Sequence, residues 1–246
     1  YTLEITGKDI AQVQAARAVI PPGTPINIAF LGNENHAQRV NAARVIRDCG
    51  FEPVPIISSR RLLSRQDRDD LLGALIAEAA PRGFLLVGGD PANPAGPYRD
   101  SLALLQDGIV ERHAIRHVGI TGYPEGHPKI ATDELWRALA WKVRFLEDAG
   151  CAVEITTQFG FDAEAILDWI ARLRDMGIEV PVRVGVPGPA DVGKLLRFAR
   201  QFGVATSLGI ASRYGLSLTN LLHRVGPERF FDRLTTGMAE GDLGRV

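Results

Sequence analysis

Short, almost wholly apolar runs alternate with longer helical patterns along this sequence. Seven of the apolar runs are expected to be strands, over residues 1–5, 26–32, 52–58, 84–88, 117–121, 152–158 and 180–186. Helices are expected over 9–19, 36–48, 66–80, 98–107, 132–149, 162–176 and 190–202, and again over 215–225 and 227–234. Strands that are apolar on both faces are typical of a parallel sheet covered by helices. The repeated strand–helix unit therefore predicts an α/β fold with right-handed crossovers.

The number of strands distinguishes an open, doubly wound sheet from a closed barrel. The first loop, TGKD at 6–9, lacks the G-x-G-x-x-G pattern that an open dinucleotide-binding sheet carries after its first strand. Seven strands favour the (β/α)8 TIM barrel. The eighth strand is not evident, because GVATS at 203–207 is short, and it could lie beyond Val246. We therefore predict one TIM-barrel-like catalytic domain over residues 1–246, with residues missing at both ends.

Composition excludes several classes of protein. The chain has 246 residues, of which 46% are hydrophobic and 23% charged, and a formal net charge of −1, so no nucleic-acid-binding or membrane-attracting surface is expected. No apolar run is long enough to span a bilayer, and the first residues do not form a signal peptide. Cys49 and Cys151 have no cysteine or histidine at ligand spacing, so neither a disulfide nor a metal site is expected. We expect a cytoplasmic protein, and a homo-oligomer is left open.

Polar residues follow several predicted strands at their carboxyl ends. Glu4 ends the first strand, Asp90 follows the fourth, Gln158 ends the sixth, and the fifth runs into GYPEGHP at 122–128. In a parallel architecture these ends form one face, which carries the binding site. Each residue has a plainer alternative: Glu4 could face solvent, Asp90 could form a turn, Gln158 could satisfy backbone groups and His127 could be a loop histidine. Their convergence on one face favours a functional site.

Other charged and aromatic residues have ordinary structural explanations. A solvated helix start is expected for the cluster Arg60, Arg61, Arg65, Asp67, Arg68, Asp69 and Asp70. The tryptophans fall at helical positions that suit packing against the barrel, and they are Trp136, Trp141 and Trp169. Lys142 follows the GYPEGHP loop by one helix, so it could be a surface residue or could reach a phosphate.

The order of these motifs resembles the methylenetetrahydrofolate reductase family of TIM-barrel flavoenzymes. The resemblance runs from Glu4 to about Gly188 and includes the GlyAsp pair after the fourth strand, YPEGHP at 123–128 and TQFGFD at 157–162. The last two motifs are specific as a pair at this spacing. The resemblance implies reduction of 5,10-methylenetetrahydrofolate to 5-methyltetrahydrofolate by NAD(P)H through bound FAD, in one-carbon metabolism and methionine biosynthesis.

The resemblance also implies roles for individual residues. Glu4 matches the acid that protonates folate N10 and opens the five-membered ring to a 5-iminium cation. Such a donor needs a pKa raised above the ordinary ~4.3 of glutamate by desolvation or hydrogen bonding. Asp90 matches the aspartate between pterin and flavin, and Gln158 matches the glutamine that holds the pterin. Positions that line FAD in the family correspond to Gly88, Gly89, Asp90, Tyr98, Tyr123, His127, Pro128, Lys129, Ile130 and Lys142.

Several departures from the family pattern fall on the flavin side. Gly88 stands where the family has an arginine, FLGNEN at 30–35 replaces an aromatic-Gly-Ala-Asn segment, and PVPIIS at 53–58 lacks a histidine. Two alternatives therefore stay open. One is a flavin-independent reductase in which NADH passes hydride directly to the iminium. The other is a non-catalytic folate-binding barrel of one-carbon metabolism.

Overall fold

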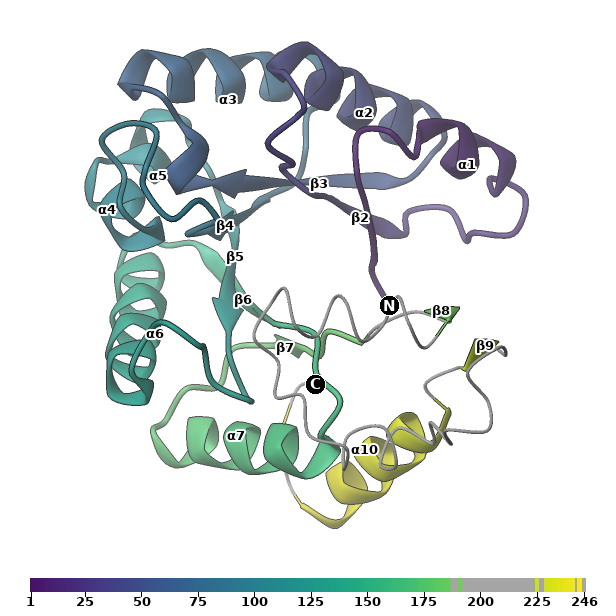
Figure 1. Ribbon diagram of the computed structural model, residues 1–246, viewed down its shortest axis with the longest axis vertical. Coiled ribbons are helices and arrows are strands. Elements are labelled where there is room, and N and C mark those ends of the chain that lie inside the picture. Colours follow the sequence, from purple (N-terminus) through teal and green to yellow (C-terminus); the bar gives the residue numbers. More distant parts are fainter. Residues whose placement is uncertain (187–189, 192–223, 226–227, 242, 245–246) are drawn as a thin grey trace. The chain divides into compact units, whose positions relative to one another are not determined.

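The computed structural model describes residues 1–186, 190–191, 224–225, 228–241 and 243–244 (Figure 1). The chain divides into two compact units. Unit 1 comprises Tyr1–Ile120 and Arg144–Val153, and unit 2 comprises Thr121–Val143 and Glu154–Val246. Three elements, the fifth strand, the sixth helix and the sixth strand, therefore begin in one unit and end in the other.

Parallel strands and helices alternate along the chain. The strands, hydrogen-bonded in this order, are β1 (Leu3–Ile5), β2 (Pro25–Ile28), β3 (Glu52–Ser58), β4 (Phe84–Val87), β5 (His117–Gly122), β6 (Ala152–Thr157) and β7 (Val182–Arg183). The helices between them are α1 (Ile10–Ala15), α2 (His36–Asp48), α3 (Arg65–Ala79), α4 (Ser101–Gln106), α5 (Ile109–Arg112), α6 (Thr132–Asp148) and α7 (Ala163–Asp175), and a 3-10 turn, η1 (Ser59–Arg61), follows β3. This order is that of an incomplete (β/α)8 TIM-barrel-like fold, which confirms the predicted class.

Most predicted bounds agree with the structure, and the differences have local causes. The strand at 52–58 and the helix at 36–48 coincide with β3 and α2. The helix predicted at 98–107 corresponds to the shorter α4. A further helix that was not predicted, α5, follows after Gly108, which adopts a left-handed φ of +74° and separates the two. The predicted strand at 203–207 and most of the helices predicted at 190–202 and 215–225 lie outside the described residues. Residues 224–225, the end of the helix predicted at 215–225, are instead part of a strand.

The elements near the end of the chain belong to unit 2. A two-stranded antiparallel sheet pairs β8 (Ala190–Asp191) with β9 (Arg224–Val225), so the predicted helix at 190–202 begins as a strand. The helix predicted at 227–234 corresponds to the longer α10 (Glu228–Glu240). None of the helices in the described ranges combines the length and the apolar character that a bilayer crossing needs.

The core of unit 1 lies between its strands and helices α2 and α3. Ile26 and Ile57 on the strands and Ile46 and Leu72 on the helices are 0% exposed. Burying a side chain of this size contributes about 1.5–3 kcal/mol to folding.

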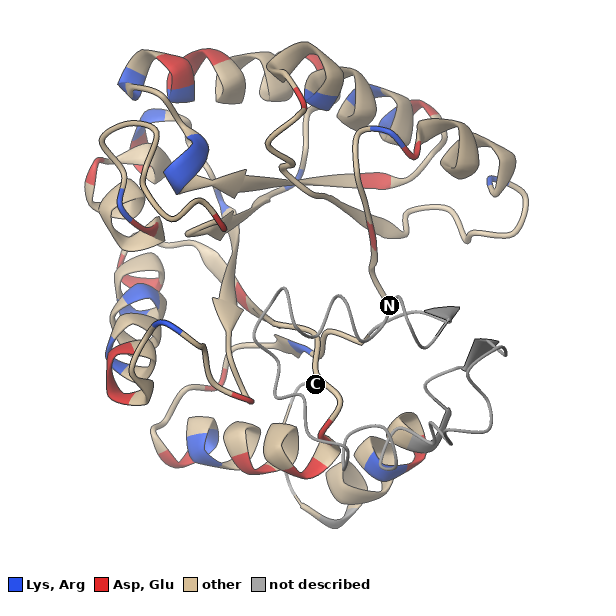
Figure 2. Cartoon of the chain, viewed as in Figure 1, with Lys and Arg blue, Asp and Glu red and all other residues tan. Residues whose placement is uncertain are grey.

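The outer surface is mixed in charge, since α3, α6 and α7 each carry both basic and acidic residues (Figure 2).

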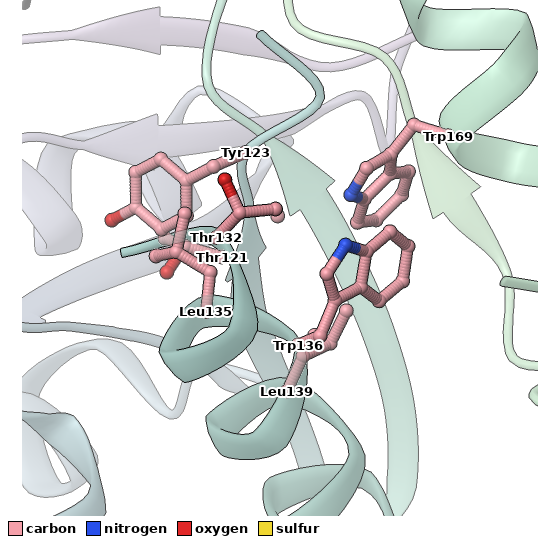
Figure 3. A pocket seen from close by; sticks show the side chains of 8 residues that line it. Thr121, Tyr123, Thr132, Leu135, Trp136, Leu139 and Trp169 are labelled. Atoms are coloured by element: carbon pink, nitrogen blue, oxygen red, sulfur yellow. The ribbon is translucent and has the colours of Figure 1, made fainter. Parts of the chain in front are cut away.

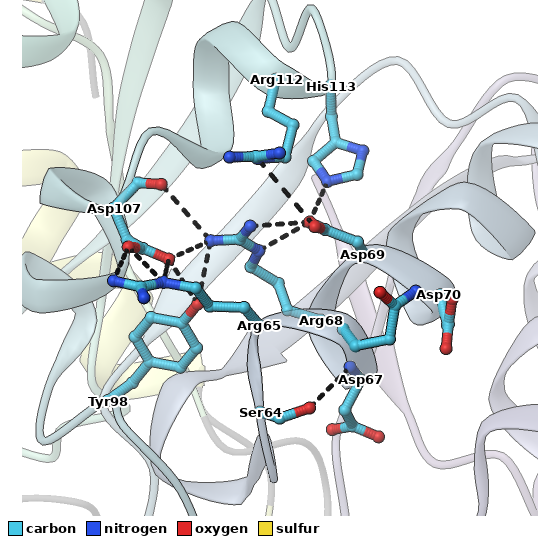
Figure 4. A network of polar contacts seen from close by, with 11 residues as sticks. Ser64, Arg65, Asp67, Arg68, Asp69, Asp70, Tyr98, Asp107, Arg112 and His113 are labelled. Carbon is cyan, nitrogen blue, oxygen red and sulfur yellow. Dashed lines mark hydrogen bonds and ion pairs between the residues drawn. The ribbon is translucent and has the colours of Figure 1, made fainter.

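One of the arginines predicted to form a solvated helix start is buried, so that prediction is wrong for Arg68, whereas Arg65 is exposed as expected. Arg68 is 0% exposed and donates to Asp107 at 2.5 Å and to the Tyr98 hydroxyl at 2.9 Å (Figure 4). Asp107 also accepts from Tyr98 at 2.7 Å and from Arg65 at 2.8 Å. The bond from Arg65 is the main reason why the pKa of Asp107 lies well below its ordinary value. A buried guanidinium needs hydrogen-bond acceptors to compensate for its lost hydration. These hydrogen bonds also connect α3 to the residues around α4.

The core of unit 2 is built around a tryptophan pair. Trp136 on α6 and Trp169 on α7 stack with ring centroids 5.3 Å apart and are each 7% exposed (Figure 3). Gly122, the last residue of β5, lies against this pair, because a Cβ there would be 2.7 Å from Trp169 Cη2. The packing expected of these two tryptophans is confirmed. Trp141 differs, since it is 36% exposed.

We predict that Gly122→Ala lowers the free energy of unfolding by about 1–3 kcal/mol, because the added methyl overpacks the site against Trp169. The control is Gly73→Ala in α3, where nothing lies within 4 Å of an added Cβ. That change should stabilise the protein by about 0.5–1 kcal/mol, as alanine replaces glycine within a helix. Chemical denaturation measures both variants, and equal stabilities for Gly122→Ala and the wild type would contradict this packing.

Candidate functional site

The predicted site residues divide between the two units. Unit 1 contains Glu4, Gly88, Gly89, Asp90 and Tyr98. Unit 2 contains Tyr123, His127, Pro128, Lys129, Ile130, Lys142 and Gln158. Within each unit, the residues that follow neighbouring strands are brought together.

Glu4 lies on β1 opposite Asn27 of β2. The residue keeps surface open to solvent, yet desolvation of its carboxyl by the surrounding protein raises its pKa. A hydrogen bond with Asn27 acts in the opposite direction and is the smaller effect. A carboxyl with a raised pKa retains its proton closer to neutral pH, which is the property that a general acid needs.

The loop after β4 is held by residues that follow β3. Gly89 adopts a left-handed φ of +96°, and a Cβ there would lie 1.9 Å from Ser58 Oγ, so only glycine fits. The Gly88 carbonyl accepts from the Arg60 amide at 2.9 Å and from Ser59 Oγ at 3.1 Å. Gly88 itself is open, because nothing lies within 4 Å of an added Cβ. The glycine pair therefore fixes the backbone at this position and leaves room beside it.

Asp90 is oriented by an arginine that the sequence did not single out for this role. Arg61 Nη2 donates to Asp90 Oδ1 at 2.5 Å, and the Asp90 side chain remains 60% exposed. The Arg61 guanidinium also packs on Gly32, where a Cβ would lie 2.3 Å from Nη1. The carboxylate is thus held in place while one side stays open to solvent. Asp90 is distant from Arg61 in sequence, so only the folded chain reveals this pair.

Tyr98 is placed differently from the rest of the predicted flavin-lining set. Its side chain is 2% exposed, and its hydroxyl contacts Arg68 and Asp107 in the network around α3. Burial is the main cause that raises the pKa of this hydroxyl to about 12. Little of the ring surface remains to contact a cofactor, and the structure accounts for this tyrosine by its hydrogen bonds.

Unit 2 joins the two loops that carry the GYPEGHP and TQFGFD motifs. Glu125 Oε1 accepts from the Phe161 amide at 2.6 Å and from the Asp162 amide at 3.1 Å. Gly160 makes room for this carboxylate, because a Cβ there would lie 2.5 Å from Glu125 Oε1. Burial raises the pKa of Glu125, and the two backbone bonds oppose that shift. Glu125 lies within the GYPEGHP motif, but its role is not evident from the sequence, because the amides that it binds follow another strand.

Gln158 is connected to the same pair of loops through its backbone. Its amide donates to the Gly122 carbonyl at 2.8 Å, and its side chain is half-buried. Asp162, four residues later, begins α7 by accepting from the Ala165 amide at 3.3 Å. The position of Gln158 is therefore fixed between the end of β5 and the start of α7.

The rest of the GYPEGHP loop forms a compact turn. Tyr123 and His127 are in edge-to-face contact with centroids 5.3 Å apart, and the Lys129 amide donates to His127 Nδ1 at 3.2 Å. A cavity of about 20 Å³ beside Tyr123 has room for about one water molecule (Figure 3). Pro128 and Lys129 are exposed. Lys142 on α6 is 7% exposed, so its alternative as a surface residue is wrong.

We predict different effects for two substitutions of Glu125. Glu125→Ala leaves two half-buried amides without an acceptor and should lower the free energy of unfolding by about 1–3 kcal/mol. Glu125→Gln keeps a carbonyl acceptor and should fold as well as the wild type. Denaturation at pH 7, with hydrogen exchange at Phe161 and Asp162, checks both, and unchanged exchange in the alanine variant would contradict the assigned contact.

The pH dependence of the glutamine variant follows from the raised pKa of Glu125. The folded protein binds this proton more tightly than the unfolded chain, whose glutamate has an ordinary value of 4.5. The resulting stabilisation is present below that value and is lost as the pH rises through the folded pKa. The stability of Glu125→Gln relative to the wild type should therefore increase with pH above 4.5.

The fold and the joined loops define a TIM-barrel-like α/β protein with polar residues at the carboxyl ends of its strands. No protein-family model matches the sequence. Over 96 residues the chain is 25% identical to methylenetetrahydrofolate reductase 2 of Saccharomyces cerevisiae. The aligned segment covers 39% of this chain and 16% of the yeast protein. The chain therefore has distant, partial similarity to a methylenetetrahydrofolate reductase and spans a small part of its length.

Proposed function

We propose that this protein reduces 5,10-methylenetetrahydrofolate to 5-methyltetrahydrofolate with NAD(P)H, through bound FAD. The observation that carries the proposal is that Glu4, on β1 opposite Asn27, has a pKa raised by desolvation, which suits the proton donor that ring opening needs. The partial similarity to the yeast reductase supports the same reaction.

The proposed chemistry assigns one task to each polar residue. Glu4 donates a proton to folate N10, so that the bond between N10 and the methylene carbon breaks and leaves a 5-iminium cation. Asp90, held by Arg61, stabilises this cation with its carboxylate. Gln158 holds the pterin by hydrogen bonds from its amide. Hydride addition to the methylene carbon then gives the 5-methyl group, and a nicotinamide nucleotide is oxidised.

FAD, when bound, would supply the hydride for this step. Within unit 1, the open space beside Gly88 leaves room for part of such a group. Within unit 2, Pro128 and Lys129 are exposed and therefore accessible to it. Tyr98 does not fit, because its ring is 2% exposed. The same holds for Lys142, which is 7% exposed. The groups proposed to contact FAD are therefore Gly88, Gly89, Asp90, Tyr123, His127, Pro128, Lys129 and Ile130.

The burial of Tyr98 and the glycine at position 88 favour a second candidate, in which NADH passes hydride to the iminium without flavin. The two candidates predict different visible absorbance for the purified protein. Purified protein with absorbance near ~450 nm, a general property of oxidised flavin, supports the first. Colourless protein that oxidises NADH with methylenetetrahydrofolate supports the second. Colourless, inert protein that still binds reduced folate supports a folate-binding barrel without catalysis.

We predict that Glu4→Gln abolishes folate reduction and leaves reduction of bound flavin by NADH nearly intact, because only the folate step needs the proton. Stopped-flow absorbance measures the two half-reactions separately. Glu147→Gln, on the exposed end of α6, is the matched control and should behave as the wild type. Equal losses in both half-reactions would show that Glu4 is not the acid.

We predict that Gln158→Ala weakens binding of 5-methyltetrahydrofolate at least about tenfold, a loss of ~1.4 kcal/mol. Binding of the cofactor should change much less, because the amide is assigned to the pterin. Isothermal titration calorimetry measures both ligands, with exposed Gln14→Ala as the control. A variant that loses cofactor affinity and keeps folate affinity would reverse the assignment.

A further inference from the structure

Glu125 in unit 2 is a half-buried carboxylate that the proposed reaction does not use. It belongs to the loop after β5, yet its hydrogen-bond partners belong to the loop after β6. Its Oε1 accepts from the amides of Phe161 and Asp162, and the lack of a side chain at Gly160 gives it room. An ionised acceptor makes stronger hydrogen bonds than a neutral one, so this carboxylate holds the two loops together.

The short segment that carries Gln158 is held at three points. The Gln158 amide donates at 2.8 Å to the carbonyl of the last residue of β5. The Gly160 amide donates at 3.2 Å to the carbonyl of Gly185, which follows β7. Glu125 holds the far end through the Phe161 amide at 2.6 Å. Loss of this third contact would therefore release one end of the segment.

Capping of α7 is the main alternative role for Glu125. The amides of Phe161 and Asp162 precede this helix, whereas the amides that need a cap are those of its first turn. Asp162 itself supplies the cap, since its side chain accepts from the Ala165 amide at 3.3 Å. Glu125 therefore binds the loop before α7 and not the helix.

The loop that contains Glu125 is a tight turn. The Gly126 amide donates to the Tyr123 carbonyl at 3.0 Å, and Gly126 adopts a left-handed φ of +81°. Tyr123 and His127 are in edge-to-face contact within the same turn. Because this turn fixes the backbone of Glu125, the hydrogen bonds of its side chain determine how the two loops lie relative to each other.

We infer that Glu125 is a positioning residue for folate, which fixes Gln158 relative to the loop of Tyr123 and His127. This inference rests on the proposed function, in which Gln158 holds the pterin and the other two residues contact the cofactor. Hydride transfer needs donor and acceptor atoms in near contact, and a displacement of about 1 Å can lower the rate ~100-fold. Glu125 itself contacts neither ligand, and its effect passes through Gln158.

A double-mutant cycle on the binding of 5-methyltetrahydrofolate tests the inference. Isothermal titration calorimetry is carried out at a temperature where circular dichroism shows every variant to be folded. Glu125→Ala should weaken binding at least about fivefold in the wild-type background and less than about twofold in the Gln158→Ala background, because the residue through which it acts is then missing. A purely structural role would weaken binding equally in both backgrounds.

Three further variants are measured in the same way. Gly160→Ala should reproduce the loss, even if Glu125→Ala fails to fold, because a Cβ 2.5 Å from Glu125 Oε1 displaces the carboxylate without removing it. Glu125→Gln keeps a carbonyl acceptor and should retain the wild-type affinity within about twofold. Glu134→Ala, at an exposed position on α6, is the matched control and should bind as the wild type does.

Two results would overturn the inference. The first is wild-type affinity in folded Glu125→Ala or Gly160→Ala, and the second is an equal loss of affinity in both backgrounds. The wild type separates these results from a failure of the proposed function. A wild type that does not bind 5-methyltetrahydrofolate at millimolar concentration refutes the folate reductase and the positioning role with it. Binding by the wild type together with an unaffected Glu125→Ala refutes only the positioning role.

Discussion

The parallel pairing of the strands is the constraint on which the rest of the structure depends. Because each described pair of the main sheet is parallel, the loops after neighbouring strands in one unit emerge at the same edge. In unit 1 this brings η1, after β3, against the loop after β4, where Arg61 meets Asp90. In unit 2 it brings the loops after β5 and β6 together, where Glu125 holds the start of α7.

Both loop contacts use a glycine to make room for a polar group. Gly89 admits Ser58 Oγ beside the loop after β4, and Gly160 admits the Glu125 carboxylate between the loops after β5 and β6. A side chain at either position would displace the polar group that it faces. The glycines thus allow side chains to hold irregular backbone, and the residues proposed to bind folate and cofactor are presented by loops with fixed anchors.

The sequence predicted local features well and long-range partnerships poorly. The bounds of α2 were predictable, because Asn35 and Gln38 form a capping box at its start. The burial of Arg68 was not predictable, because a run of charged residues at a helix start suggests an exposed surface. Its partner Asp107 lies near α4, far away in the sequence. Glu34 shows the same limit. A loop carboxylate looks solvated in a sequence, and only the packed chain shows that it is 8% exposed.

The mass of the folate product formed in D2O tests the proposed hydride route most directly. Hydrogen on N5 of a reduced flavin exchanges with solvent, whereas hydrogen on C4 of NADH does not. With unlabelled NADH, methylenetetrahydrofolate and the wild-type chain, the account predicts 5-methyltetrahydrofolate that carries one deuterium in its methyl group. An unlabelled methyl group would replace the flavin route by direct transfer, and the absence of any 5-methyltetrahydrofolate would contradict the reductase itself.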